Sequence, residues 1–359
     1  MSNPIRIGIV GTGGMANHHA KTFNTIPGVT LASCLDVVPE RAREFAAKHN
    51  VARIAASLEE LLDQADAVSV VTPDRFHAEP SIAALRAGKH LLCEKPLTVT
   101  LAEARRVAVA AQDASRQGVV HMIDFSYRAS AAFQKAIQLV AGGALGEVRH
   151  VHSYYLQSWL TSDIWGNWSK EALLWRLQTA AGSGGALGDL GCHILDMTTA
   201  VAGEVKRARC DMRTFPKLAA DGGVVTEWQG RKLDANDTAL IELELHNGAT
   251  GVVQVSRWAT GHANSLRLEV HGTTGALLFD LDRDPNQIDL CLDGDRHHLT
   301  WKSEKLPQAP NIWQRFIAAI QNRQPDQPDV LRGAQVQAYL DACERSAVSG
   351  RWEAVEAWT

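Results

Sequence analysis

The opening of the sequence constrains the fold most, because an apolar run passes directly into a glycine-rich turn. "IRIGIV" (5–10) is β-branched and apolar, and "GTGGMA" (11–16) continues it. The first glycine of such a turn permits a tight bend, the second lets backbone approach a pyrophosphate, and the final small residue packs the next helix on the strand. A strand, this turn and a helix together predict a dinucleotide-binding unit. The residues expected to contact the dinucleotide here are Gly11, Thr12, Gly13, Gly14 and Met15.

The same pattern repeats along the first third of the chain. Further apolar runs occur at 30–36, 67–72, 89–95 and 118–124. Continuous apolar runs are typical of parallel strands that are buried on both faces. Between them, Ser57 with Glu60 and Thr100 with Glu103 have the spacing of capping boxes that begin helices. The alternation predicts an α/β fold over residues 1–125, with a doubly wound parallel sheet of the Rossmann kind.

Asp36 stands at the end of the second predicted strand. A carboxylate there accepts hydrogen bonds from the adenosine ribose hydroxyls and repels a 2′-phosphate, which favours NAD over NADP. Arg41 and Arg43 follow closely, so NADP stays possible. The alternative is a solvated aspartate at the end of a strand in a fold that binds no nucleotide.

Two later strands also end in polar segments, "TPDRFH" (72–77) and "CEKPL" (93–97). Ligands of open α/β sheets bind at the carboxyl ends of the strands. Lys95 precedes a proline and is therefore held in an extended conformation. For His77, the alternative is a capping or packing role. For Glu94 and Lys95, the alternative is a surface ion pair. The cofactor contacts expected at this edge are Thr72, Pro73, His77, Glu94 and Lys95.

From about residue 147 the pattern changes to longer alternating runs with hairpin signals. "HNGAT" (246–250) joins two such runs through an Asn-Gly turn. The sequence predicts an α+β domain over 126–359 with a large, mostly antiparallel, open-faced sheet. The strands are expected at 147–156, 206–215, 237–245, 251–259, 265–272, 276–281, 287–293 and 296–301, with helices at 311–322 and 332–349 and a loop at 216–236. The last helices are expected to pack back near the first domain. A wide sheet face left open predicts a homodimer or homotetramer.

The stretch "GGALGDLGCHILD" (184–196) admits several chemistries. Asp189 and His193 are four residues apart, which places them on one face of a helix as a proton relay. With Asp196 they form a metal alternative, but one histidine and no thiolate make a poor zinc set. The glycines resemble a phosphate cradle, but no P-loop Lys and Ser follow them. A purely structural helix start capped by Asp189 is the remaining alternative. The relay is favoured, and no metal is expected.

Tryptophan is frequent just before this stretch, at Trp159, Trp165, Trp168 and Trp175. These side chains either pack in an ordinary core or form the wall of a sugar site, where apolar ring faces meet C–H groups and polar side chains hold hydroxyls.

Taken together, "GTGGMA", "TPDRFHAEPSIAALRAGKHLLCEKPL" and "GALGDLGCHILD" resemble the Gfo/Idh/MocA family of NAD(P)-dependent oxidoreductases. The resemblance extends to "AYLDACERSAVSGRW" (338–352). It implies a second domain whose sheet carries the substrate and the subunit contacts, and catalytic roles for Lys95, Asp189 and His193. Within the family, the stretch around 174–196 is most similar to levoglucosan-type and inositol-type sugar dehydrogenases. The substrate contacts it implies are Tyr127, Arg128, Trp165, Trp175, Arg176, Asp189 and His193.

The chain departs from the family pattern at "MIDFSYRAS" (122–130). Many members carry Gly where Asp124 stands, Asn at Ser126, and Phe-x-Pro after the arginine that matches Arg128. The wall beside the nicotinamide is therefore expected to differ, which affects the identity of the substrate more than the catalytic residues.

Composition excludes other classes of function. The 359 residues carry a net charge of −4 and no Lys/Arg run, which argues against a nucleic-acid partner. No apolar run is long enough for a membrane span, and the first strand begins too early for a signal peptide. Six scattered cysteines suit a cytoplasmic protein.

These features together predict an NAD-dependent enzyme that oxidises a hydroxyl of a sugar, inositol or related polyol. In this hypothesis His193 is the general base, Asp189 orients it, and Lys95 stabilises the alkoxide. The alternatives are a glycosidase that uses NAD transiently and a non-catalytic NAD-binding sensor.

Overall fold

The computed structural model describes residues 3–219 and 221–358, which divide into two compact units. The first unit comprises residues 3–126, 310–337 and 358, and the second comprises the described residues of 127–309 together with 338–357. The predicted second domain covers 126–359, with its last helices packing back near the first domain. The segment 310–337 belongs instead to the first unit, because its apolar side chains lie in the core of that unit.

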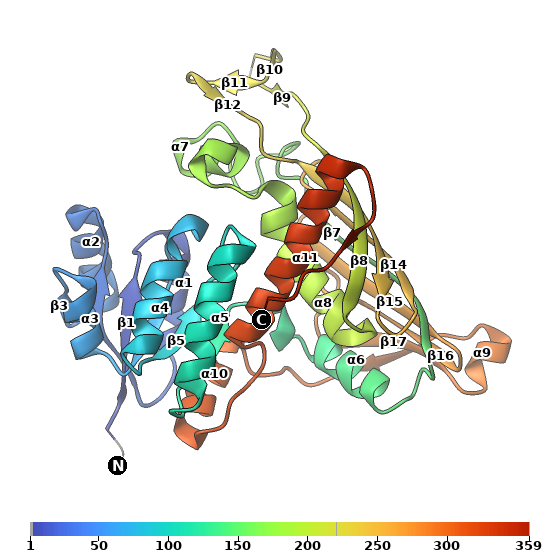
Figure 1. The fold of residues 1–359 in the computed structure, drawn as a ribbon, viewed down its shortest axis with the longest axis horizontal. Coiled ribbons are helices and arrows are strands. Elements are labelled where there is room, and N and C mark those ends of the chain that lie inside the picture. The colour runs from blue at the N-terminus through green and yellow to red at the C-terminus, as the bar shows by residue number, and fades with distance from the viewer. Residues whose placement is uncertain (1–2, 220, 359) are drawn as a thin grey trace. The chain divides into compact units, whose positions relative to one another are not determined.

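The first unit is built on a six-stranded sheet, ordered β3-β2-β1-β4-β5-β6. Every pair in it is parallel, which confirms the predicted doubly wound sheet. The strand order reverses between β1 and β4, the place where open α/β sheets bind ligands. The strands are β1 (Ile5–Val10), β2 (Val29–Leu35), β3 (Arg53–Ile54), β4 (Ala67–Val70), β5 (His90–Cys93) and β6 (His121–Ile123). The helices are α1 (Gly14–Phe23), α2 (Pro39–His49), α3 (Leu58–Gln64), α4 (Ala78–Arg86), α5 (Leu101–Ser115) and α10 (Ile312–Asn322) (Figure 1).

Both predicted helix starts are present. The Ser57 hydroxyl accepts a hydrogen bond from the Glu60 amide at the beginning of α3. Thr100 and Glu103 form a complete capping box at α5, in which each side chain binds the other residue's backbone N–H. These caps satisfy amides that have no partner inside the helix.

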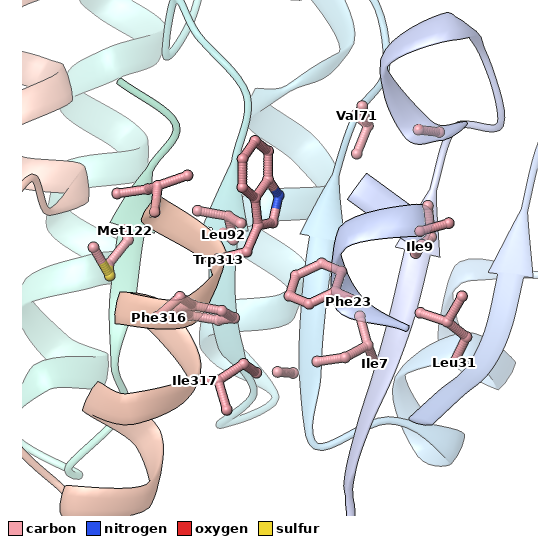
Figure 2. Packing of buried hydrophobic residues seen from close by; sticks show 14 of the residues in the cluster. Ile7, Ile9, Phe23, Leu31, Val71, Leu92, Met122, Trp313, Phe316 and Ile317 are labelled. Carbon is pink, nitrogen blue, oxygen red and sulfur yellow. The ribbon is translucent and has the colours of Figure 1, made fainter. Parts of the chain in front are cut away.

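The core of the first unit lies between the sheet, α1 and α10 (Figure 2). Phe23 of α1 and Phe316 of α10 are fully buried beside Ile7 of β1. Trp313, one turn before Phe316 on α10, is also buried there. Fully burying a large apolar side chain contributes roughly 1.5–3 kcal/mol, so the apolar face of α10 stabilises this unit.

The second unit is built on a nine-stranded sheet, ordered β18-β17-β16-β15-β7-β14-β13-β8-β19. All its neighbours are antiparallel except β7 and β14, which confirms a mostly antiparallel sheet. The long strands are β7 (Val148–Leu156), β8 (Val205–Arg213), β13 (Thr238–Leu245), β14 (Thr250–Ser256), β15 (Ser265–Gly272), β16 (Gly275–Asp280) and β17 (Gln287–Leu292), and the short edge strands are β18 (Lys302–Lys305) and β19 (Glu353–Ala354).

Helices cover one face of this sheet. α8 (Cys192–Ala202) packs on β7 and β15, and α6 (Ala131–Ala141) packs on β16, β17 and α8. Along β13, buried and exposed side chains alternate, so the opposite face is open within this unit. α11 (Val330–Ser349) contributes residues to both units, and α7 (Glu171–Leu174) is a single short turn. No described helix is both long enough and apolar enough to cross a membrane.

Two local predictions are wrong. The run 296–301 is not a strand, since α9 (Asp295–His298) occupies its first half and Leu299 follows in a left-handed conformation with φ 54°. The segment 216–236 is not only loop, because β9 (Lys217–Leu218) pairs with β10 (Val224–Val225), and β11 (Glu227–Trp228) pairs with β12 (Arg231–Lys232). Strands of two residues are too short to show a periodic pattern.

Candidate active site

The turn between β1 and α1 has the form that a pyrophosphate needs. Gly11 has φ +90°, and a Cβ there would lie 2.8 Å from the carbonyl oxygen of Val71. Gly13 and Gly14 face open space, since a Cβ on either would have no heavy atom within 4 Å. Ala16 is fully buried where α1 meets the core. The exposed backbone and the first amides of α1 therefore form a cradle that fits the phosphates of NAD.

Asp36 at the end of β2 is held by this turn. Its Oδ2 accepts hydrogen bonds from the amide and the hydroxyl of Thr12, both at 2.8 Å, and its Oδ1 accepts from the Val38 amide at 2.9 Å. Partial burial alone would raise the pKa of Asp36, but these hydrogen bonds outweigh burial and lower it. The carboxylate is thus ionised and oriented, as an acceptor for ribose hydroxyls must be.

His77 connects the turns that follow β4 and β5. It is buried, with Nδ1 2.8 Å from the carbonyl oxygen of Pro96 and Nε2 2.8 Å from that of Thr72. His77 therefore has a packing role, because its ring joins the turn that contains Thr72 to the turn that contains Pro96. Contacts of His77, Thr72 and Pro73 with the cofactor stay predictions.

Glu94 and Lys95 do not form a simple surface pair. Glu94 is buried, and its Oε1 lies 3.0 Å from Nε2 of His19 on α1. Its Oε2 accepts a hydrogen bond from the backbone N–H of Lys95 at 3.1 Å. The Lys95 side chain is partly exposed at the carboxyl edge of the sheet.

Asp189 lies in a widened turn in the second unit. A π-helical segment (Leu187–Gly191) precedes α8 and contains Asp189, whereas His193 lies in the first turn of α8. Asp189 Oδ2 accepts a hydrogen bond from Nη2 of Arg257 at 2.9 Å, and the guanidinium of Arg176 lies at 3.7 Å. Arg257 is almost fully buried and also donates to the carbonyl oxygens of Gly185 and Arg176. The carboxylate of Asp189 is therefore fixed by a buried cation.

His193 is buried between aromatic rings. The ring of Tyr127 meets it edge-on with centroids 4.9 Å apart, and the ring of Tyr155 lies at 6.0 Å. The two tyrosine hydroxyls are 2.9 Å apart, and the Tyr155 hydroxyl also donates to the amide oxygen of Asn264 at 2.6 Å. Burial raises the pKa of Tyr155 well above its ordinary value. The His193 ring thus lies beside a hydrogen-bonded chain formed by Tyr127, Tyr155 and Asn264.

Arg128 and Asp196 bind each other in the interior of the second unit. Nε and Nη2 of Arg128 each lie 2.7 Å from a carboxylate oxygen of Asp196, and both residues are buried. The pair joins the segment before α6 to α8. A contact of Arg128 with substrate stays a prediction.

The tryptophans divide into two kinds. Trp159 and Trp168 are buried in a cluster with Leu160, Leu174 and Leu177. Trp165 is 43% exposed, and Trp175 is partly exposed with the guanidinium of Arg176 4.8 Å from its ring centre. Packing explains the first two. The Trp165 side chain is exposed, and the Arg176 guanidinium covers one face of the Trp175 ring.

Comparison with known protein families decides what kind of protein this is. Residues 5–122 match the model described as an oxidoreductase family with an NAD-binding Rossmann fold. Residues 133–278 match the GFO/IDH/MocA C-terminal domain. The chain belongs to the Gfo/Idh/MocA oxidoreductase family. It is accordingly an NAD-dependent oxidoreductase, and the cradle at Gly11–Gly14 lies within its NAD-binding domain.

Relatives in this family act on sugars and related compounds, as their names state. A levoglucosan dehydrogenase from Pseudarthrobacter phenanthrenivorans is 28% identical over 97% of each chain. A myo-inositol 2-dehydrogenase from Thermotoga maritima is 28% identical over 81% of this chain and 80% of its own. Among solved structures, a levoglucosan dehydrogenase complex with NADH and levoglucosan has a TM-score of 0.86 at 26% identity, covering 99% of this chain and 100% of its own. An oxidoreductase domain protein from Kribbella flavida has a TM-score of 0.85 at 30% identity with the same coverage.

Four residues of this Gfo/Idh/MocA protein's candidate site escaped the sequence analysis: His19, Tyr155, Arg257 and Asn264. His19 carried a usable signal, since it shares the buried face of α1 with Ala16, Ala20 and Phe23. A histidine on an otherwise apolar helix face needs a buried partner. Arg257 carried a similar signal, because it directly follows the apolar strand β14. Tyr155 and Asn264 carried none, since the ends of β7 and β15 come together only in the folded sheet.

Proposed function

We propose that this protein is a dehydrogenase that transfers hydride between a secondary hydroxyl of a sugar, anhydrosugar or inositol and NAD. The observation that carries the proposal is the buried His193, set among Tyr127 and Tyr155 and four residues after the arginine-bound Asp189. A sensor would need no such arrangement. The names of the relatives support the substrate class.

In this proposal His193 accepts the hydroxyl proton, because histidine is the side chain best suited to general base catalysis near neutral pH. Asp189 stabilises the imidazolium that forms and keeps the ring oriented, while Arg257 holds Asp189 in place. Lys95 supplies a positive charge for the developing alkoxide. NAD, when bound, supplies the hydride acceptor. Gly11, Thr12, Gly13, Gly14, Met15 and Asp36 would hold it, with Thr72, Pro73, His77, Glu94 and Lys95 at the edge of the sheet.

The substrate contacts are assigned to polar and aromatic groups of the second unit. Trp165 and Trp175 offer ring faces for the C–H surface of a sugar, and Arg176 and Tyr127 offer donors for its hydroxyls. Arg128 completes the assigned set. Because Asp196 binds its guanidinium, we assign Arg128 the role of shaping the segment that carries Tyr127.

We also propose that the protein is a cytoplasmic homo-oligomer formed through the open sheet face. Leu240 is 51% exposed and Val252 41% exposed on that face, and all six cysteines are free thiols. Burying such side chains against a second copy is favourable. Light scattering coupled to gel filtration is expected to give the mass of a dimer or tetramer, and a monomer at micromolar concentration would contradict this.

The function is tested by NAD reduction at 340 nm with a panel of anhydrosugars, inositols and aldoses. We expect net NADH with at least one of them, and His193→Asn should lower turnover by about 10²–10⁴-fold. The affinity for NAD, measured by calorimetry on the same variant, should stay within a few-fold. Absence of NADH with every sugar, or full turnover in the variant, would contradict the proposal.

A further inference from the structure

Three ionisable side chains meet in the interior of the first unit. His19 comes from α1, Glu94 follows β5 and Asp124 follows β6, and all three are buried. Nε2 of His19 lies 3.0 Å from Oε1 of Glu94 and 3.1 Å from Oδ2 of Asp124. We call these residues the buried triad. Two carboxylates therefore share one ring nitrogen, which is an unusual arrangement in a core.

The contacts indicate which charge the ring carries. Nε2 needs its hydrogen to bind either carboxylate, and Nδ1 lies 2.9 Å from the hydroxyl of Ser69 on β4. Burial opposes a charge on His19, but the hydrogen bonds from its ring to Asp124 and Glu94 outweigh burial and raise its pKa to about 9. Burial and the neighbouring Glu94 raise the pKa of Asp124, while His19 outweighs burial at Glu94 and lowers the pKa of that carboxyl. Two carboxylates on one ring nitrogen and the raised pKa of the ring both favour the imidazolium form of His19.

Glu94 links the His19 ring to Lys95 at the carboxyl edge of the sheet. Its other oxygen accepts the backbone N–H of Lys95 at 3.1 Å. A chain of bonds therefore runs from α1, which begins in the glycine-rich cradle, through His19 and Glu94 to Lys95. Other groups close to the ring are apolar or neutral: Trp313 lies edge-on at 5.0 Å and Phe23 at 6.3 Å. The other ionisable groups that act on the triad are Lys95 and His18. Lys21 acts on His18.

We propose that His19 is a positioning residue, whose imidazolium binds Glu94 and Asp124 and thereby fixes the backbone of Lys95 relative to the NAD cradle. The inference rests on the proposed role of Lys95 in the reaction. Asp124 supplies the second carboxylate on the same ring nitrogen. With a second carboxylate present, a neutral residue at 19 would leave two buried negative charges with Lys95 as the nearby positive charge and no cation bound between them, which is strongly unfavourable.

The first test measures the protonation state of the His19 ring and needs no substrate. We use the full-length protein with ¹⁵N-labelled histidine and follow the His19 ring nitrogens by NMR from pH 6 to 10. The proposal predicts an imidazolium at pH 7, and Asp124→Asn should lower its pKa by about one unit or more. A neutral ring at pH 7 would overturn the proposal, and so would stoichiometric divalent metal retained by the three side chains after dialysis, detected by elemental analysis.

The second test is a rescue. His19→Gln should speed hydrogen exchange at the Lys95 amide by about tenfold or more, and His19→Gln with Asp124→Asn should recover most of the protection because the second negative charge is gone. His18→Gln, at the exposed neighbouring position, is the matched control, and its effect on this exchange should be much smaller than that of His19→Gln. A purely steric role of His19 predicts no rescue, so equal loss in the single and double variants would overturn the proposal.

Turnover gives the third readout. We expect His19→Gln to lower kcat by about 10–100-fold with little change in KM, and the double variant to recover at least fivefold. Unchanged kcat in His19→Gln would overturn the link to Lys95. If the wild-type protein oxidises none of the sugars in the panel, the proposed function fails, while the ring titration and amide exchange still decide the role of His19.

Discussion

At the scale of single residues, each unit has a buried cation that binds a carboxylate of the proposed machinery. His19 holds Glu94 in the first unit, and Arg257 holds Asp189 in the second. Each fixes a carboxylate whose buried cationic partner was not predicted from the sequence. A buried charge without a partner is costly, so the positions of these carboxylates depend closely on residues outside the recognised motifs.

Arg257 provides a direct test of this dependence. Arg257→Met removes the donor to Asp189 while filling a similar volume, so we expect kcat/KM to fall by about 10²-fold. Arg257→Lys keeps the charge and should recover part of that loss. NAD affinity is the control, since Arg257 and the cradle belong to different units, and calorimetry should find it unchanged. Full activity in Arg257→Met would show that Asp189 needs no such support.

At the scale of elements, the first turn and its helix were predictable in detail. Gly11 is required by its backbone conformation, Thr100 and Glu103 form the predicted capping box, and the apolar runs became parallel strands. These features are local, so their signals lie within a few residues. The π-helical turn at Leu187–Gly191 was not predictable, because its i, i+5 period depends on packing of the segment against β13 and β14.

The glycine-rich turn yields a paired prediction. Gly11→Ala forces a Cβ to within 2.8 Å of the Val71 carbonyl oxygen at φ +90°, so it should destabilise the fold by about 1–3 kcal/mol. Gly13→Ala meets no atom within 4 Å and should leave the melting temperature unchanged. The same methyl group would occupy the space for the pyrophosphate, so it should weaken NAD binding by tenfold or more. Calorimetry and thermal unfolding separate the two effects, and a destabilised Gly13→Ala would contradict this assignment of roles.

At the scale of the whole molecule, neither unit is one continuous segment of the chain. The core of the first unit needs α10, which in sequence follows every strand of the second unit's sheet except β19. The helix predicted at 311–322 was expected to pack near the first domain, and its apolar side chains do lie in the core of that unit. Its pattern alone did not specify which surface of that domain it covers. The contact between Asp189 and Arg257, which was not predicted, spans 68 positions.

Stability of the molecule should depend on pH through the buried triad. The pKa of His19 is raised from 6.5 to about 9 in the folded state. Its stabilising contribution is therefore complete below pH 6.5 and is lost as the pH rises through 9, by roughly 3 kcal/mol at most. Between pH 6.5 and 10, the free energy of unfolding in urea should fall more steeply for the wild type than for His19→Gln. Parallel curves for the two proteins would contradict the buried imidazolium.

The central claim, net hydride transfer from a sugar hydroxyl to NAD, is tested most directly with a sugar that is fully deuterated on carbon. The best substrate of the panel is incubated with the protein and NAD, and the cofactor is recovered for mass spectrometry. We expect NADH that carries one deuterium, in equal amounts with a ketone product. Substrate consumed without accumulation of NADH, as an NAD-using glycosidase would do, or NADH without deuterium, would contradict it.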